Sequence, residues 1–271
     1  MINESLTVLT LPYEQRTKTV RVYVPAHEEG ETLPVVYMTD GQNLFEAETV
    51  RFGCWYTREI VRAERENTGR AAIIVGIHND GDSLERLNEL TPKTIGSLLL
   101  SPDMSQEMRE GLVPCGESFD DFVVRIVMPT VEEQFPVKTG RAYTAFCGSS
   151  SGGLQAFFTV LTHQEKFAAG GIFSPAFPLY EPDDLAQWVR EHTGQAVPFL
   201  YLYAGGADPL EQDIAAAMTS VGAILQETCP PKELYQLLQP DQPHHESAWS
   251  PVFADFLHLF LESSVQANKK V

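Results

Sequence analysis

The fold is decided by residues 143–158, YTAFCGSSSGGLQAFF, which have the pattern of a buried strand, a tight turn between glycines and then a helix. Residues 148–152 match G-x-S-x-G, a nucleophile elbow in which the central serine occupies a strained turn. Small neighbours are needed because this turn brings the flanking backbone segments close together. Ser150 has glycine two residues away on both sides and is the predicted nucleophile, since frames centred on Ser149 or Ser151 have poorer flanks.

A nucleotide-binding loop is a second interpretation of this glycine-rich turn. A P-loop needs a lysine after its last glycine to reach the phosphates, followed by serine or threonine for magnesium. Here Gly153 is followed by Leu154 and Gln155, so no nucleotide site is predicted.

Strand and helix patterns alternate along most of the chain. Residues 5–11 and 19–25 alternate in character, which is typical of antiparallel strands. Apolar runs typical of strands buried on both faces lie at residues 35–38, 71–77, 142–147, 168–173, 198–204 and 233–238. Helical patterns lie at residues 56–67, 119–134, 152–163, 182–192, 209–227 and 247–262. This order predicts an α/β fold class with a mostly parallel, doubly wound sheet and antiparallel N-terminal strands.

One long segment interrupts this alternation. Residues 1–271 contain no linker and are expected to form a single domain. Within it, residues 78–117 connect a strand to a helix with scattered glycine and proline, and connections of this length are usually lids or binding loops. A short helical pattern at residues 105–112 is expected to form part of a lid over the site.

Composition limits the classes of partner. The net charge of -18 and the pI near 4.7 argue against nucleic acid and against anionic membranes, and favour neutral or cationic substrates. The N-terminal residues lack a signal-peptide pattern and no stretch of eighteen apolar residues occurs, so a cytoplasmic location is expected. The four cysteines form no C-x-x-C pair, which argues against a zinc ribbon and a redox motif. The composition leaves open whether the chain forms a homo-oligomer.

Two later segments supply the partners that a serine nucleophile needs. Behind such an elbow the triad follows the order serine, acid, histidine. The strand at 198–204 is followed by Asp208, and the last strand is followed by His244 and His245. Asp208 is expected to orient an imidazole that takes the serine proton and returns it to the leaving group.

The oxyanion hole requires two backbone N–H donors. The first is expected from Ser151, directly after the nucleophile. The second is expected from the loop after the strand at 35–38, where Gly41 allows a tight backbone path. Gln42 is the predicted donor, with Asn43 as the alternative.

Five segments resemble the putative esterase family of α/β-hydrolases, which includes enterochelin, feruloyl and acetylxylan esterases, esterase D-type enzymes and mycolyltransferases. They are YMTDGQNLF at 37–45, RLNELTP at 86–92, CGSSSGG at 147–153, IFSPAF at 172–177 and HHESAW at 244–249. The resemblance implies a three-layer sandwich, Ser150 as nucleophile and no metal or organic cofactor. It favours His244 as the catalytic histidine, because that residue lies two before Glu246 and five before Trp249.

The chain departs from the family pattern at a few positions. The first motif often has histidine where this chain has Thr39, and the elbow often has methionine in place of Ser151. Some relatives carry glutamate near the position of Asp208. The Ser151 contribution would be its backbone N–H, so that change should leave the chemistry intact.

The resulting hypothesis is a serine-dependent carboxylic ester hydrolase that acts on a small-molecule ester through an acyl-enzyme. An acyltransferase, a siderophore trilactone esterase and a catalytically inactive binding module stay open as alternatives. Arg86 and Glu89 either form a structural ion pair or line the site. Glu246 and Trp249 are candidates for substrate contact.

Overall fold

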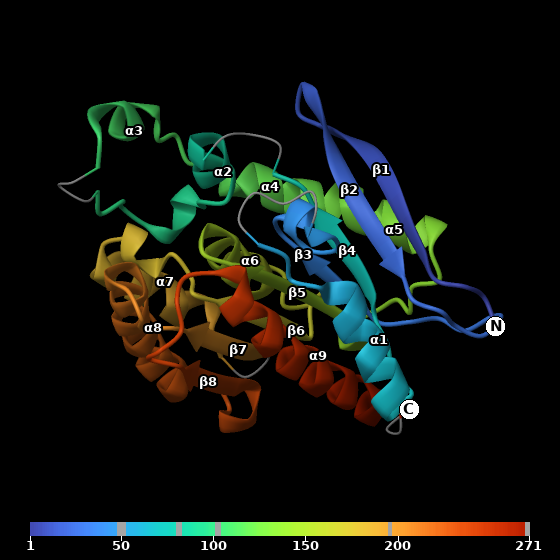
Figure 1. Cartoon of the computed structure of the whole chain (residues 1–271). Helices are drawn as coiled ribbons and strands as arrows, with labels where there is room; N and C mark the ends of the chain where they lie inside the picture. The colour runs from blue at the N-terminus through green and yellow to red at the C-terminus, as the bar shows by residue number, and fades with distance from the viewer. Residues whose placement is uncertain (48–52, 80–82, 101–103, 195–196, 269–271) are drawn as a thin grey trace.

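The computed structural model describes residues 1–47, 53–79, 83–100, 104–194 and 197–268. One eight-stranded sheet runs through it in the order β1-β2-β4-β3-β5-β6-β7-β8 (Figure 1). The strands are β1 Ser5–Tyr13, β2 Arg16–Val24, β3 Val35–Met38, β4 Ile73–Ile77, β5 Thr144–Ser149, β6 Ala169–Phe173, β7 Phe199–Ala204 and β8 Leu234–Leu238. Each expected strand is confirmed, with ends that shift by a few residues.

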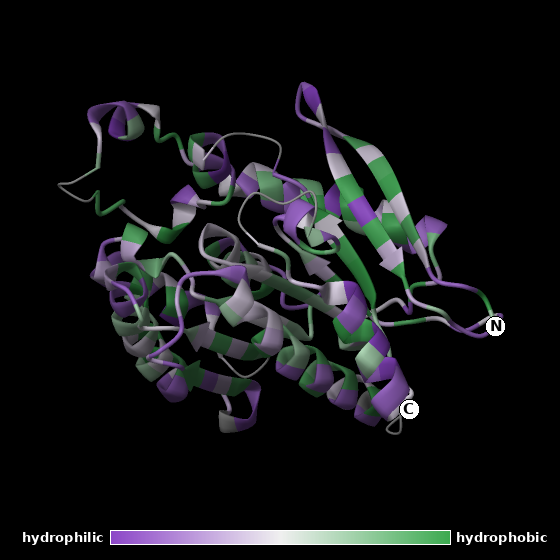
Figure 2. Cartoon of the chain, in the orientation of Figure 1, coloured by the Kyte–Doolittle hydropathy of each residue, from purple (hydrophilic) through white to green (hydrophobic). Residues whose placement is uncertain are grey.

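The direction of pairing follows the character of the strands. β1 pairs with β2, and β2 with β4, in antiparallel fashion, whereas every pair from β4 through β3 to β8 is parallel. Strands β3 to β6 are buried along their whole length. Such burial is expected for a parallel sheet whose crossover helices cover both faces. Figure 2 accordingly shows largely hydrophobic central strands, with hydrophilic residues concentrated on outer helical turns.

Helices cover the two faces of the sheet (Figure 1). They are α1 Thr57–Thr68, α4 Gly116–Phe122, α5 Met128–Gln134, α6 Ser151–Thr162, α7 Pro182–His192, α8 Pro209–Thr228 and α9 Glu246–Asn268. Successive residues of β3 point to opposite faces: Val36 and Met38 pack with residues of α1 and α9, whereas Val35 and Tyr37 pack with residues of α4, α6, α7 and α8. The result is the expected three-layer α/β sandwich.

The segment between β4 and α4 contains α2 Ser83–Glu89, the 3-10 turn η3 Lys93–Ile95 and α3 Gln106–Gly111. A buried ion pair anchors α2 to the sheet, because Lys18 Nζ on β2 lies 2.7 Å from Glu89 Oε1. Lys18 is only 1% exposed and also donates a hydrogen bond to the His78 carbonyl oxygen at 3.1 Å. The base of this segment is therefore fixed to the body of the protein, and its role as a lid stays a prediction.

No helix in the described part of the chain combines the length and the apolar character that crossing a membrane requires.

Candidate active site

Ser150 lies in the turn between β5 and α6. Its backbone has φ 60° and ψ -127°, a conformation that non-glycine residues avoid and that stores strain. The Ser150 N–H donates to the Phe173 carbonyl oxygen at 2.9 Å and holds the turn in place. The geometry is that of the strained turn that the sequence predicts.

Two glycines make this turn possible. A Cβ on Gly148 would lie 2.3 Å from the Gly152 carbonyl oxygen, and a Cβ on Gly152 would lie 2.1 Å from Thr39 Oγ1. Real side chains do not tolerate such contacts, so the steric reason for choosing the frame around Ser150 is confirmed.

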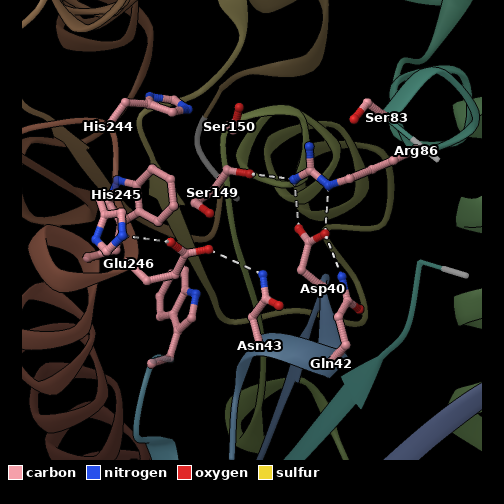
Figure 3. Close-up of a pocket in the computed structure, with 12 residues that line it drawn as sticks. Asp40, Gln42, Asn43, Ser83, Arg86, Ser149, Ser150, His244, His245 and Glu246 are labelled. Carbon is pink, nitrogen blue, oxygen red and sulfur yellow. Dashed lines mark hydrogen bonds and ion pairs between the residues drawn. The ribbon is translucent and has the colours of Figure 1, made fainter. Parts of the chain in front are cut away.

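Ser150 borders a cavity of about 320 Å³ that is built from four parts of the chain. These are the loop after β3, helix α2, the elbow and the start of α9. Figure 3 shows His244 and Arg86 on opposite sides of the Ser150 hydroxyl. The lining residues are Asp40, Gln42, Asn43, Trp55, Ser83, Arg86, Ser149, Ser150, His244, His245, Glu246 and Trp249.

His244 is held by a buried carboxylate. Its Nδ1 lies 2.6 Å from Glu211 Oε1, and Glu211 has no solvent exposure. The second oxygen of Glu211 accepts a hydrogen bond from the Gly205 N–H at 2.6 Å. An ionised carboxylate only accepts hydrogen bonds, so with such a partner Nδ1 would carry the proton and the lone pair of Nε2 would be free. The Trp249 ring packs edge-on against the imidazole, with centroids 5.0 Å apart.

The prediction that Asp208 orients the imidazole is wrong. Asp208 is the N-cap of α8, where Oδ1 accepts from the Glu211 N–H at 2.9 Å and Oδ2 from the His244 backbone N–H at 3.2 Å. The bond from Glu211 is the main cause that lowers the pKa of Asp208. The hydrogen bonds of this carboxylate thus go to backbone N–H groups, and none goes to the ring.

Glu211 was missed although the sequence carries a signal for it. Asp208 followed by Pro209 begins a helix, which places Glu211 in the first turn, three residues after the cap. A glutamate at that position of a capping box reaches back toward the helix start. The loop that precedes α8 lies beside His244, so a glutamate that reaches back to the helix start can contact the imidazole.

The two predicted oxyanion donors lie in first helical turns. Ser151 begins α6, and Gln42 lies in the 3-10 turn η1 Gly41–Asn43. N–H groups in a first turn have no carbonyl partner inside their own helix and are available to a ligand. The alternative donor, the Asn43 N–H, is occupied because it donates to the Asp40 carbonyl oxygen at 2.8 Å.

The Gln42 side chain is fixed from two sides. Its Oε1 accepts a hydrogen bond from the Asn79 N–H at 3.2 Å, and its Nε2 donates to Asp40 Oδ1 at 3.4 Å. These contacts orient the turn that carries the second predicted donor.

Arg86 both forms an ion pair and lines the cavity. Its Nε lies 2.6 Å from Asp40 Oδ1, and an Nη donates to Oδ2 at 2.8 Å, which makes the pair bidentate. Burial lowers the pKa of Arg86, but the charge and hydrogen bonds of Asp40, together with the nearby carboxylates, outweigh this effect and raise the pKa. Glu89, in contrast, pairs with Lys18 away from the cavity. Arg86 therefore lines the site, whereas Glu89 belongs to a structural ion pair with Lys18.

Glu246 is a second buried carboxylate on the cavity wall. It is 6% exposed, and its Oε1 accepts a hydrogen bond from Asn43 Nδ2 at 3.2 Å. Burial raises its pKa. The neighbouring His245 turns its Nδ1 toward Ser247 Oγ, 2.9 Å away. The Trp249 indole N–H donates to Ser174 Oγ at 2.9 Å, so it is committed to the protein.

Among the described residues, no cluster of three or more histidine, cysteine, aspartate or glutamate side chains is placed to hold a metal ion.

Comparison with known proteins shows the family and the fold of the chain. The family described as "Putative esterase" matches residues 13–248. The solved structures are similar at low identity. An IroE-like serine hydrolase from Shewanella oneidensis superposes with a TM-score of 0.71 at 19% identity, over 95% of this chain and 80% of that chain.

Two fungal enzymes share the fold as well. Siderophore hydrolase EstA from Aspergillus nidulans gives a TM-score of 0.71 at 19% identity, over 96% of this chain and 94% of that chain. A ferulic acid esterase from Anaeromyces mucronatus gives 0.64 at 18% identity, over 97% and 92%. The two fungal proteins are named for different substrates, a siderophore and ferulic acid, so the shared fold does not select one.

Proposed function

The chain belongs to the esterase family that matches residues 13–248 and is a carboxylic ester hydrolase, and from this premise we propose that it cleaves esters through an acyl-enzyme on Ser150. The observation that carries the proposal is one cavity that is bordered both by a serine on a strained elbow and by the His244–Glu211 pair. This combination is what nucleophilic catalysis by serine requires.

In the first step, Ser150 Oγ attacks the ester carbonyl carbon while His244 Nε2 takes the hydroxyl proton. The tetrahedral intermediate collapses, the bond to the alcohol oxygen breaks, and His244 returns the proton to the departing alkoxide. Water then repeats the sequence on the acyl-enzyme, so that acid and free Ser150 are released. The alcohol and the acid together contain the atoms of the ester and one water.

Glu211 is the orienting acid in this proposal. Its short bond to Nδ1 fixes the tautomer of His244 and stabilises the imidazolium that forms in each step. The Gly205 N–H and the complete burial of Glu211 hold the carboxylate still. Asp208 is a positioning residue, because it caps the helix that carries Glu211 and binds the backbone of His244.

The oxyanion hole is assigned to the backbone N–H groups of Ser151 and Gln42. Both belong to first helical turns beside Ser150, and preorganised donors of this kind stabilise the charge that develops on the carbonyl oxygen.

The size of the cavity favours compact esters. At about 320 Å³ it lies at the low end of small-molecule sites. A siderophore trilactone or a transferred acyl group with a large acceptor would have to extend beyond it, so hydrolysis of small esters is the first choice. An inactive binding module is the least favoured, since strain at Ser150 has a cost that binding alone does not require.

Turnover of short-chain nitrophenyl esters tests the proposal. Wild type is expected to hydrolyse the acetate or butyrate ester, and Ser150→Ala is expected to lose at least about 10³-fold of that rate. Equal rates in the two folded proteins would refute it.

A further inference from the structure

Two carboxylates that line the cavity, Asp40 and Glu246, and a third behind His244, Glu211, differ in how completely the protein binds them. Asp40 has a bidentate partner in Arg86, and Glu211 has both His244 and the Gly205 N–H. Among the described residues, Glu246 has fewer and weaker partners than either of these carboxylates. It lines the same cavity but has no role in the proposed reaction.

The two oxygens of Glu246 can be accounted for separately. Oε1 accepts one hydrogen bond, from Asn43 Nδ2 at 3.2 Å. Oε2 faces His245 Nε2 at 3.9 Å, which is too long for a hydrogen bond. A carboxylate offers about four acceptor sites. The backbone N–H of Glu246 also bonds to its own carboxylate. Within the described part of the chain, the remaining acceptor capacity of Glu246 is unused, although its side chain is only 7% exposed.

Glu246 is open to a ligand from the cavity, which it lines. On another side Gly53 packs closely, because a Cβ on Gly53 would lie 3.1 Å from Glu246 Oε2 and 3.0 Å from His245 Cε1, which is tighter than most real contacts. A buried charge with few partners is costly, and a donor from a ligand in the cavity would offset the cost. The raised pKa of Glu246 is the expected sign of that cost.

We propose that Glu246 is a specificity-determining residue that accepts a hydrogen bond from a hydroxyl or ammonium group on the ester substrate. The inference rests on the proposed function, since the group must belong to an ester bound at Ser150. An anionic group would be repelled by Glu246 itself and by the strongly negative chain. The favoured substrates are hydroxylated or amino-substituted esters.

The test compares matched esters. One series varies the alcohol, with ethyl, 2-hydroxyethyl and 2-aminoethyl butyrate; the other varies the acid, with naphthyl butyrate, 3-hydroxybutyrate and 3-aminobutyrate. In at least one series, wild type is expected to have a kcat/KM about tenfold or more higher for a donor-bearing ester than for its plain counterpart. Glu246→Leu should reduce that preference to about twofold or less.

Glu246→Gln separates the two donor types. Its amide oxygen still accepts from a hydroxyl but carries no charge, so a hydroxyl preference should persist while an ammonium preference should largely vanish. Glu262→Gln removes an equal charge from an exposed position on α9 and should leave all preferences unchanged. Gly53→Ala keeps the carboxylate, but the new Cβ would lie 3.0 Å from Glu246 Cβ and 3.1 Å from Oε2 and should displace the side chain, so it should weaken the preference even if Glu246→Leu fails to fold.

Labelling of Ser150 by a fluorophosphonate separates the possible failures. If wild type is labelled and hydrolyses plain and donor-bearing esters equally well, or if folded Glu246→Leu keeps the preference, the role of Glu246 is wrong and the proposed function stands. If wild type is neither labelled nor active on any ester, the proposed function fails and the role of Glu246 with it.

Discussion

His244 Nδ1 lies 2.6 Å from Glu211 Oε1, and the carboxylate of Asp208, three residues earlier, binds the backbone of the same two residues. Glu211 therefore contacts the imidazole ring, whereas Asp208 binds the backbone of Glu211 and of His244. Substitutions of these two acidic residues should consequently have different effects on activity.

Glu211→Gln should reduce kcat by about 10²–10⁴-fold, because an amide cannot stabilise the imidazolium and leaves the tautomer of His244 undetermined. Asp208→Asn should stay within about tenfold of wild type, since asparagine is also a good N-cap. Initial rates on a nitrophenyl ester, with thermal melts as a check of folding, measure both. A larger loss in Asp208→Asn than in Glu211→Gln would return the acid role to Asp208.

The two adjacent histidines should differ in the same assay. His244→Ala removes the proposed base and should lower kcat by roughly 10²-fold or more, whereas His245→Ala should keep at least about a tenth of wild-type activity. The reason is that His245 turns its Nδ1 toward Ser247 and not toward Glu211. The assignment is overturned if the two folded variants exchange these behaviours.

Breaking the anchor of α2 should cost stability. Lys18→Met leaves the carboxylate of Glu89 buried, with the more distant Arg16, 3.3 Å away, as its paired cation, and should lower the free energy of unfolding by about 3 kcal/mol. Adding Glu89→Gln removes the uncompensated charge and should recover part of the loss. Urea unfolding of wild type, single and double variants measures this coupling. Additive effects of the two substitutions would show that the pair is not the anchor.

The raised pKa of Glu246 predicts a pH-dependent gain from Glu246→Gln. Because the folded-state pKa lies above the unfolded value, the stability linked to protonated Glu246 is fully present below the ordinary glutamate pKa and is lost as pH rises through the raised value. The neutral variant avoids that loss. Near pH 7 it should be more stable than wild type by on the order of 1 kcal/mol.

The gain should shrink markedly by about pH 4, where the wild-type carboxyl is mostly protonated in both states. Among the residues that the structure describes, His245, Asp40 and Arg86 are the charged or titratable groups that shift the pKa of Glu246, and all three are present in both proteins. Chemical unfolding at several pH values measures the difference. A gain that is equal at pH 4 and pH 7 would contradict the assignment of the raised pKa.

Features set by neighbouring residues were predictable from the sequence. The elbow follows from local sterics, since Gly148 and Gly152 must approach within contact distance, and the strands follow from uninterrupted apolar runs. The start of the last helix and the histidine before it also lie in one short motif.

Features that join distant segments were not predictable. Asp40 and Arg86 are 46 residues apart, and nothing in either segment alone indicates that they pair. The choice between Asp208 and Glu211 depends on where the first turn of α8 points relative to a loop 33 residues later. A sequence pattern places both carboxylates near the histidine, but only tertiary structure shows which one reaches the ring.

The most direct test of the central claim is mass spectrometry of the intact folded protein after treatment with a fluorophosphonate, followed by peptide mapping. One probe per chain is expected on Ser150, with labelling abolished in Ser150→Ala and slowed by roughly 10²-fold or more in Glu211→Gln, because the same histidine activates the serine toward the probe. Labelling at another residue, or equal labelling of wild type and Ser150→Ala, would contradict the account.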